Sequence, residues 1–231
     1  MTTSRCRAGG IDPRCTLYRR VTFASCYVYS PCGSNAASER SRQLRALLKS
    51  SDAHFIFKYA VRVRQQVTDN SPLTGFLCPN NVLVPIPGST RTGIGAASVA
   101  EHLAMALIEE GLGQGVWRGL HRIRAVQKSA TAAPGARPTV ANHYDSFAIE
   151  EAADLEAVTT LPQRVVLVDD VVTKGRTLLA AAMRVREALP GAEIRAFALL
   201  RTMGFVQEID RLLDPCVGEI RWRAGDAHRN P

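Results

Sequence analysis

The chain has 231 residues, of which 46% are hydrophobic and 22% charged, and its formal net charge is +8. These values are typical of a globular protein with a sizeable core. No apolar run reaches the roughly 18 residues that a membrane span requires, and the N-terminus lacks the apolar segment of a secretory signal. We therefore expect a cytoplasmic protein without a membrane partner.

The positive charge is concentrated near the N-terminus. Residues 1–50 hold nine Lys or Arg and two acidic residues, whereas residues 51–231 are close to neutral. A basic segment of this kind can bind nucleic acid or another polyanion, although it is more often a solvated surface. Nucleic acid therefore stays an alternative partner.

The cysteine pattern bears on metal binding. Six cysteines, at positions 6, 15, 26, 32, 78 and 216, form no C-x-x-C pair. The spacing of a zinc ribbon is therefore missing, and zinc is not expected. In a chain of this size without an export signal we expect reduced thiols. An irregular metal site built from the first four cysteines stays open.

The first part of the chain predicts a short strand and two helices. Residues 21–29 are β-prone within an Arg-, Cys- and Gly-rich segment. The sequence AASERSRQLRALLKS has a helical apolar pattern and ends near Ser50, and residues 54–67 place Phe55, Ile56, Tyr59 and Val63 on one helical face. We assign residues 1–70 to a basic N-terminal extension and hood, meaning a segment that covers the binding site.

Strands alternate with helices from residue 82 onward. Strands are predicted over residues 82–86, 116–123, 147–149, 164–169 and 194–200, and helices over 93–113 and 177–189. Residues 164–169 are apolar on both faces, as in a buried parallel strand. This order predicts an α/β fold with an open, mainly parallel sheet flanked by helices, in residues 71–213.

Two further segments complete the predicted division of the chain. Residues 124–146 show no periodicity, which predicts a long loop, and such loops in compact domains are usually functional. Residues 214–231 are predicted to form a polar C-terminal tail.

Two adjacent carboxylates follow the buried strand, at Asp169 and Asp170. Ligands of open parallel sheets bind beyond the carboxyl ends of the strands. The loop behind the pair contains Thr173, Gly175 and Thr177 and leads into a helix, whose first turn offers unpaired amides to an anion. Lys174 and Arg176 add positive charge. This arrangement predicts a phosphate site.

The carboxylates require a different partner from the loop, because like charges repel. Hydroxyl groups and hard cations such as Mg²⁺ are natural partners of a carboxylate pair. A ligand that offers a phosphate at one end and a diol, or a metal-chelated diol, nearby satisfies both requirements. The sequence therefore predicts binding of a sugar phosphate.

The segment VLVDDVVTKGRT resembles the phosphoribosyl-pyrophosphate (PRPP) signature of type I phosphoribosyltransferases. The resemblance implies their fold, with Asp169 and Asp170 on the ribose hydroxyls and residues 173–177 around the 5′-phosphate. Lys174 departs from the family, which usually has a small residue or Thr there. The PRPP-binding residues implied are Val168, Asp169, Asp170, Val171, Val172, Thr173, Lys174, Gly175, Arg176 and Thr177.

Two other segments support this resemblance, which covers roughly residues 80–202. VPIPGSTR, at residues 84–91, resembles the strand and turn that hold pyrophosphate, and implies that Pro87, Gly88 and Ser89 contact PRPP. Residues 120–149 resemble the ComF-like branch, with its Arg-rich loop. The resemblance makes Arg124 a PRPP ligand and implies Mg²⁺ bound through PRPP, while metal binding by the acidic pair itself stays open. The catalytic residues that it implies are Asp169, Asp170, Arg91, Lys128 and Arg137.

The implied activity is transfer of phosphoribosyl to an unidentified base or other nucleophile, with release of pyrophosphate. Residues 15–60 and Trp222 are the candidates for recognising the acceptor, although Trp222 is more simply explained by packing. Two alternatives stay open: a PRPP- or nucleotide-sensing regulator without turnover, and a nucleic-acid-associated protein of competence, recombination or phage defence. A homodimer is expected by analogy with the family.

Overall fold

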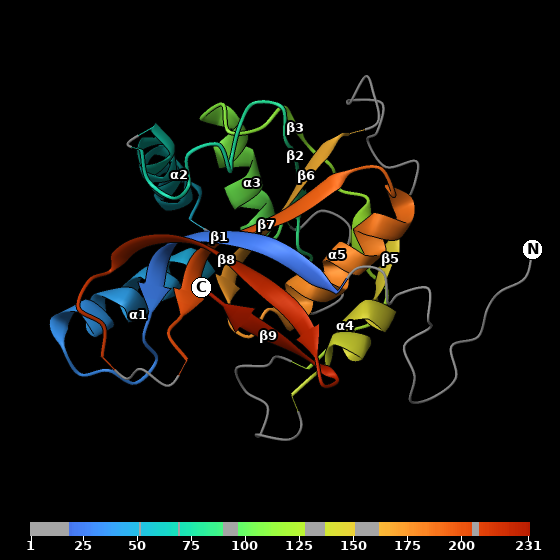
Figure 1. The fold of residues 1–231 in the computed structure, drawn as a ribbon. Helices are drawn as coiled ribbons and strands as arrows, with labels where there is room; N and C mark the ends of the chain where they lie inside the picture. The colour runs from blue at the N-terminus through green and yellow to red at the C-terminus, as the bar shows by residue number, and fades with distance from the viewer. Residues whose placement is uncertain are drawn as a thin grey trace, which may run out of the picture.

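The computed structural model describes residues 19–50, 52–68, 70–89, 97–127, 137–150, 162–204 and 208–231. These residues form a mixed α/β structure in which helices flank a mostly parallel sheet (Figure 1). One face packs against α1 (Ala36–Lys49), α2 (Ala53–Thr68) and α3 (Val99–Glu109). The other face packs against α4 (Val140–Ser146) and α5 (Arg176–Ala188). The predicted fold class is confirmed at this level.

The main sheet has seven strands. Their spatial order is β3 (Gly115–Val116), β2 (Val82–Pro85), β6 (Arg164–Val172), β7 (Glu193–Thr202), β1 (Arg20–Tyr29), β8 (Leu213–Arg223) and β9 (Asp226–Asn230). The first five strands run parallel, and β8 and β9 are antiparallel additions at one edge. A separate antiparallel pair is formed by β4 (Leu120–Arg122) and β5 (Phe147–Ile149).

Strand β6 lies inside the sheet because its side chains are apolar on both faces. Val165 and Leu167 pack on the side of α5, whereas Val166 and Val168 pack on the side of α3. The strand was predicted to end at the acidic pair, but it continues to Val172. The reason is β7, whose backbone pairs with β6 as far as Val172 and Arg201.

The predicted helices are present, and three of them shift by only one or two residues at their ends. The helix predicted over 93–113 is shorter: α3 begins after the Ser98 N-cap and ends at Glu109. Helix α1 begins where the Asn35 side chain accepts a 2.9 Å hydrogen bond from the Ser38 amide, and its cap is Ser50. Helix α2 buries Ile56, Tyr59 and Val63 as expected. Helix α5 begins one residue earlier than predicted, at Arg176.

Two segments that we assigned to an extension and to a polar tail contribute strands to the main sheet. Strand β1, from the extension, lies between β7 and β8 and buries a continuous run of side chains. Strands β8 and β9 form a hairpin that closes one edge. Their polar composition hid them, because this hairpin fully buries only Ile220 and Ala227 among its side chains.

The predicted strand over 116–123 and the predicted loop over 124–146 both differ from the structure. The chain leaves the main sheet at Val116, buries Trp117 and re-forms as β4. The end of the loop is helix α4, which starts with a capping box between Thr139 and Asn142. This helix has too few residues for apolar periodicity to reveal it.

The structure bears on two expectations, the absence of a membrane span and the presence of reduced thiols. Within them, no helix combines the length and apolarity needed to cross a membrane. Cys26, Cys32, Cys78 and Cys216 are free thiols, as predicted. Cys6 and Cys15, two of the four ligands of the irregular metal site, lie outside the described residues.

Candidate functional site

The site begins where β6 extends beyond its neighbour β2. The last paired residues of the two strands are Pro85 and Val168, and the Ile86 amide donates to the Val168 carbonyl at 2.8 Å. The chain of β2 then turns away through residues 87–89. Among the described strands, residues 169–172 pair only with β7. The acidic pair therefore lies at an open step on the carboxyl side of the parallel sheet, the usual place for a ligand.

The two carboxylates have different surroundings. The Asp170 amide donates to Asp169 Oδ1 at 2.9 Å, and the Asp170 carboxylate forms an ion pair with Lys49 at the end of α1. Burial, followed by the charge of Asp170, raises the pKa of Asp169 well above its ordinary value. A hydroxyl group or cation that approaches Asp170 must share this carboxylate with Lys49, which is half exposed.

The loop after β6 changes direction at Gly175. This residue has φ of 84°, in the left-handed region that favours glycine, and is the N-cap of α5. A Cβ atom here would lie 2.6 Å from the Ile220 side chain of β8. Because glycine has no side chain to cap the helix, the first-turn amides of α5 are left for another acceptor, such as a phosphate.

The two cations of this loop are held by Asp226 on β9. Arg176 donates from Nε and Nη2 to the two carboxylate oxygens, both at 2.6 Å, and from Nη1 to the Pro138 carbonyl at 3.1 Å. Lys174 Nζ lies 3.5 Å from the same carboxylate. Hydrogen bonds from Arg176 are the main cause that lowers the pKa of Asp226 to about 2. The predicted phosphate-binding cations thus anchor the loop to the C-terminal hairpin.

Thr177 is next to a buried histidine that the sequence left unassigned. His143, on α4, is 5% exposed, and its Nε2 lies 3.5 Å from Thr177 Oγ1. Burial first, and then the charges of Arg122 and Arg176, lower the pKa of His143 to about 4. The imidazole is therefore neutral near pH 7. Thr173, on the other side of Gly175, is exposed.

Arg122 is the site residue that sequence analysis missed. It is 6% exposed and contacts the 87–89 turn, where its Nε donates to the Gly88 carbonyl at 2.6 Å. It also contacts Ser146 Oγ and lies over the Phe147 ring, 4.3 Å from its centroid. The only signal in the sequence was an Arg alternating with Leu120 on a short strand, among several other Arg residues.

The remaining predicted residues are dispersed. Arg124 is exposed and donates to the Asp145 carbonyl at 2.7 Å, and Arg137 is exposed at the start of the segment that leads into α4. Val168 and Val172 are buried in the core, so only their backbone faces the site. Trp222 packs, partly buried, against the α5-side core. Arg91 and Lys128 lie outside the described residues.

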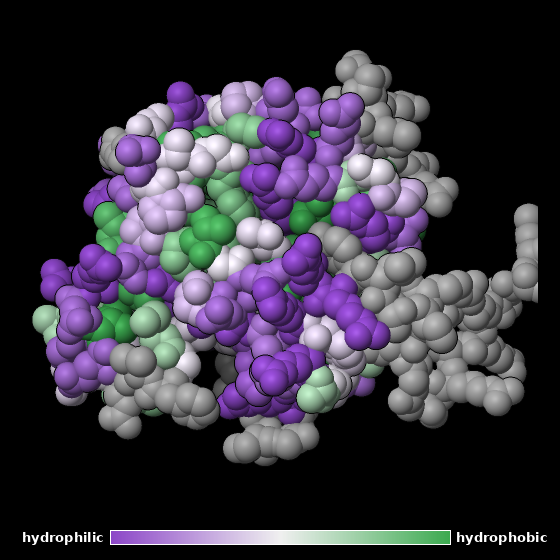
Figure 2. Space-filling model, viewed as in Figure 1, coloured by the Kyte–Doolittle hydropathy of each residue, from purple (hydrophilic) through white to green (hydrophobic). Residues whose placement is uncertain are grey.

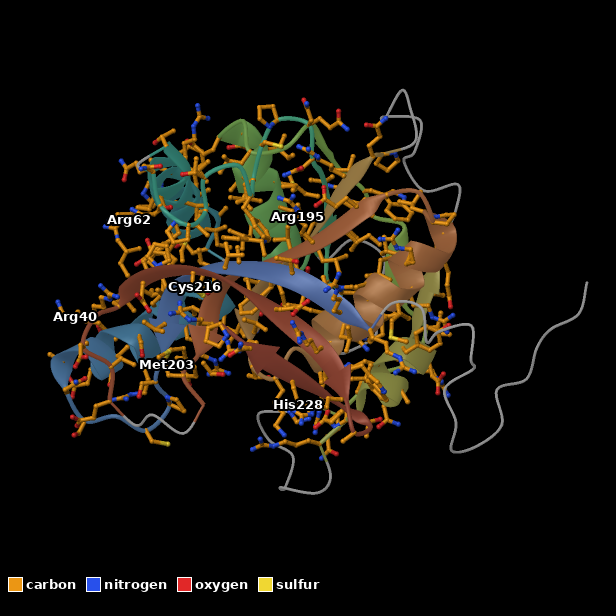
Figure 3. All side chains as sticks on the ribbon, in the orientation of Figure 1. Arg40, Arg62, Arg195, Met203, Cys216 and His228 are labelled. Carbon is orange, nitrogen blue, oxygen red and sulfur yellow. The ribbon has the colours of Figure 1, made fainter. Side chains whose placement is uncertain are left out.

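The surface near the carboxyl ends of the strands is hollowed. Figure 2 shows this hollow between the region of Met203, which follows β7, and the β9 strand. Figure 3 labels Met203 and His228 on its two sides. The hollow therefore opens beside the edge of the sheet at which β6 and β7 end.

Comparisons with known proteins are weak. No protein-family model matches the chain, and no curated protein matches its sequence. One solved structure that is similar is an adenine phosphoribosyltransferase from Leishmania donovani, with 13% identity and a TM-score of 0.27 over 87% of this chain and 88% of that one. A TM-score of this size does not by itself establish a shared fold or function.

Replacing Gly175 by Ala is expected to destabilise the protein by about 1–3 kcal/mol, because Ala is strained at positive φ and its Cβ would collide with Ile220. Urea unfolding measures this free energy. Gly191→Ala is the matched control, since a Cβ atom added at Gly191 would meet no atom within 4 Å. Equal stability of the two variants would contradict the described loop.

The ion pair of Asp226 with Arg176 should make stability depend on pH below 4. The folded pKa of Asp226 is about 2, against 3.8 for the free group, so its stabilisation is present above pH 3.8 and is lost as pH falls towards 2. We expect the loss to be of the order of 1 kcal/mol. The free energy of unfolding of Asp226→Asn, measured in urea between pH 2 and 5, should lack this pH-dependent component. If it changes with pH in parallel with that of the wild type, Asp226 is not the source of the pH dependence.

Proposed function

We propose that the chain is a type I phosphoribosyltransferase-like protein of the ComF-like branch, which binds PRPP with Mg²⁺ and transfers its phosphoribosyl group to a base or other nucleophile. One observation carries this proposal: a single strand–loop–helix unit, β6 to α5, presents the acidic pair and the uncapped helix start at the open step of the sheet. Acceptors of hydroxyl hydrogens and donors to a phosphate are thus adjacent.

The acidic pair is the proposed ribose site. Asp169 and Asp170 accept hydrogen bonds from the ribose hydroxyls, and Lys49 must move from Asp170 or share it. Lys49 has half of its side chain exposed and a long flexible stem, so this movement costs little packing. In the free protein the lysine charge offsets the repulsion between the two carboxylates.

The loop over residues 173–177 is the proposed 5′-phosphate site. Its donors are the backbone amides around Gly175 and the hydroxyls of Thr173 and Thr177, and the helix dipole of α5 adds a partial positive charge. Lys174 and Arg176 mainly hold the loop in place, because both are paired with Asp226. This arrangement explains how a lysine is accommodated where the family usually has a small residue or Thr.

The 87–89 turn is the proposed pyrophosphate site. Ile86 is hydrogen-bonded to Val168, which places the turn directly beside the acidic pair. Departure of pyrophosphate from the ribose C1 develops negative charge that nearby cations stabilise. Arg124 and Arg137 are the proposed cations within the described residues, and Arg91 and Lys128 are proposed from the sequence alone.

Mg²⁺ fits the residues present. The ion is commonly held by one or two carboxylates together with phosphate oxygens of its substrate, and the acidic pair offers this number of side chains. Asp169 and Asp170 would hold it or its waters, while PRPP supplies the other ligands. When bound, the ion would neutralise charge on the leaving pyrophosphate.

The alternatives differ in what they require of the site. A PRPP-sensing regulator needs the same binding residues without turnover, so pyrophosphate release from PRPP with a panel of bases separates it from the enzyme. Nucleic-acid binding depends on the basic N-terminus, of which residues 1–18 lie outside the described residues, and it would show a steep dependence of affinity on salt. A cytoplasmic location and a homodimer stay predictions.

Isothermal calorimetry with PRPP and Mg²⁺ tests the proposed function. The double variant Asp169→Asn/Asp170→Asn should bind PRPP at least about tenfold more weakly, because it loses charge-assisted hydrogen bonds to the ribose hydroxyls. Asp210→Asn, at an exposed loop position, is the control and should bind as the wild type does. Equal affinity of the wild type and the double variant would remove the ribose role of the pair.

A further inference from the structure

Arg122 is a buried cation that donates hydrogen bonds to the turn after β2 and to Ser146 at the end of α4. Its guanidinium donates to the Gly88 carbonyl at 2.6 Å and to the Pro87 carbonyl at 3.4 Å. Its third contact is Ser146 Oγ, which in turn donates to the His143 carbonyl at 2.6 Å. A buried arginine is costly unless it is fully engaged, so its presence below this turn calls for an explanation.

The contacts determine which way two peptide groups face. The peptide bonds of the described residues are trans, and in a trans peptide the N–H of one residue points opposite to the carbonyl before it. The carbonyls of Pro87 and Gly88 point towards Arg122. The amides of Gly88 and Ser89 therefore point away from it.

The next carbonyl is held in the same way. Ser89 accepts a 2.9 Å hydrogen bond from the Val126 amide, so the turn is fastened along one side by Arg122 and the segment after it. A Cβ atom built on Gly88 would meet no atom within 4 Å, so the turn is not closely covered at Gly88. Two successive amides thus face a place where a ligand can approach the backbone. Successive amides of this kind form an anion-binding concavity.

We propose that Arg122 is a positioning residue for the pyrophosphate end of the ligand: by holding the carbonyls of Pro87 and Gly88, it turns the Gly88 and Ser89 amides towards the anion. This inference rests on the proposed function for the identity of the anion. Three of the five N–H donors of Arg122 are used within the protein, two of them on these carbonyls, and the role proposed for Arg122 requires no contact between it and the ligand.

The position of Arg122 between two subsites makes the proposal selective. Its direct contacts lie on the 87–89 turn, on Ser146 and on the Phe147 ring, whereas the proposed 5′-phosphate site depends on Gly175 and α5 and is linked to Arg122 only indirectly, through Ser146 and His143. Loss of the guanidinium should therefore affect pyrophosphate binding much more than binding of a sugar phosphate. A merely structural residue would weaken both.

Calorimetry with two probes, pyrophosphate and ribose 5-phosphate, each with Mg²⁺, provides the test on the full chain. Arg122→Met should weaken the affinity for pyrophosphate about tenfold, because the Gly88 and Ser89 amides lose their orientation. The affinity for ribose 5-phosphate should stay within about twofold of the wild-type value. Arg122→Lys should also weaken pyrophosphate, because one ammonium cannot replace the planar fork. Arg118→Met is the matched control, an exposed arginine paired with Glu101, and should change neither affinity.

The outcomes separate this inference from the function on which it rests. A wild-type protein that binds ribose 5-phosphate but not pyrophosphate overturns the inference and leaves the sugar-phosphate site standing. A protein that binds neither probe overturns both. Equal losses for the two probes in folded Arg122 variants, or no loss for either, also overturn the role of Arg122.

A second measurement covers the case in which the Arg122 variants do not fold. In the wild-type protein, the amide NMR signals of Gly88 and Ser89 should shift on addition of pyrophosphate and stay unchanged with ribose 5-phosphate. The signals of Thr173 and Gly175 should show the opposite response. If pyrophosphate leaves the Gly88 and Ser89 signals unmoved, the inference fails.

Discussion

The site depends on the unequal lengths of two neighbouring parallel strands. Strand β2 ends its pairing at Pro85, whereas β6 continues to Val172 along β7. If β2 extended as far as β6, residues 169–172 would be paired with a strand on each side, and no room for a ligand would remain beside them. The step leaves the edge of β6 over residues 169–172 without a strand partner on the β2 side, next to the turn that follows β2, while the Asp170 carboxylate is buried against Lys49. A ligand placed there can reach both the turn and the start of α5.

The C-terminal hairpin, formed by β8 and β9, and helix α4 hold the loop behind the step. The C-terminal hairpin contributes Asp226, which binds Arg176, and Ile220, which packs against Gly175. Arg229 of the same hairpin donates to the carbonyls of Val172 and Thr202, at the ends of β6 and β7. Helix α4 adds His143 beside Thr177. The loop is thus preorganised by long-range contacts, which reduces the entropy lost when a ligand binds.

Much of the fold could be predicted from the sequence, because strands 164–169 and 194–200 and the two N-terminal helices have clear apolar patterns. The candidate site was predicted where it is local, in the run from Asp169 to Thr177. Arg122, the ion pair of Lys49 with Asp170 and the contacts of Asp226 join segments far apart in the chain, and no local pattern reports them. Strands β8 and β9 were missed because an edge hairpin buries few side chains.

A crystal structure of the protein with ribose 5-phosphate and Mg²⁺ tests the central claim most directly. The claim predicts the phosphate on the amides of residues 173–177, the ribose hydroxyls on Asp169 and Asp170, and Lys49 moved from its place in the free protein. A ligand bound elsewhere on the molecule, or an undisturbed ion pair between Lys49 and Asp170 with the step empty, would contradict it.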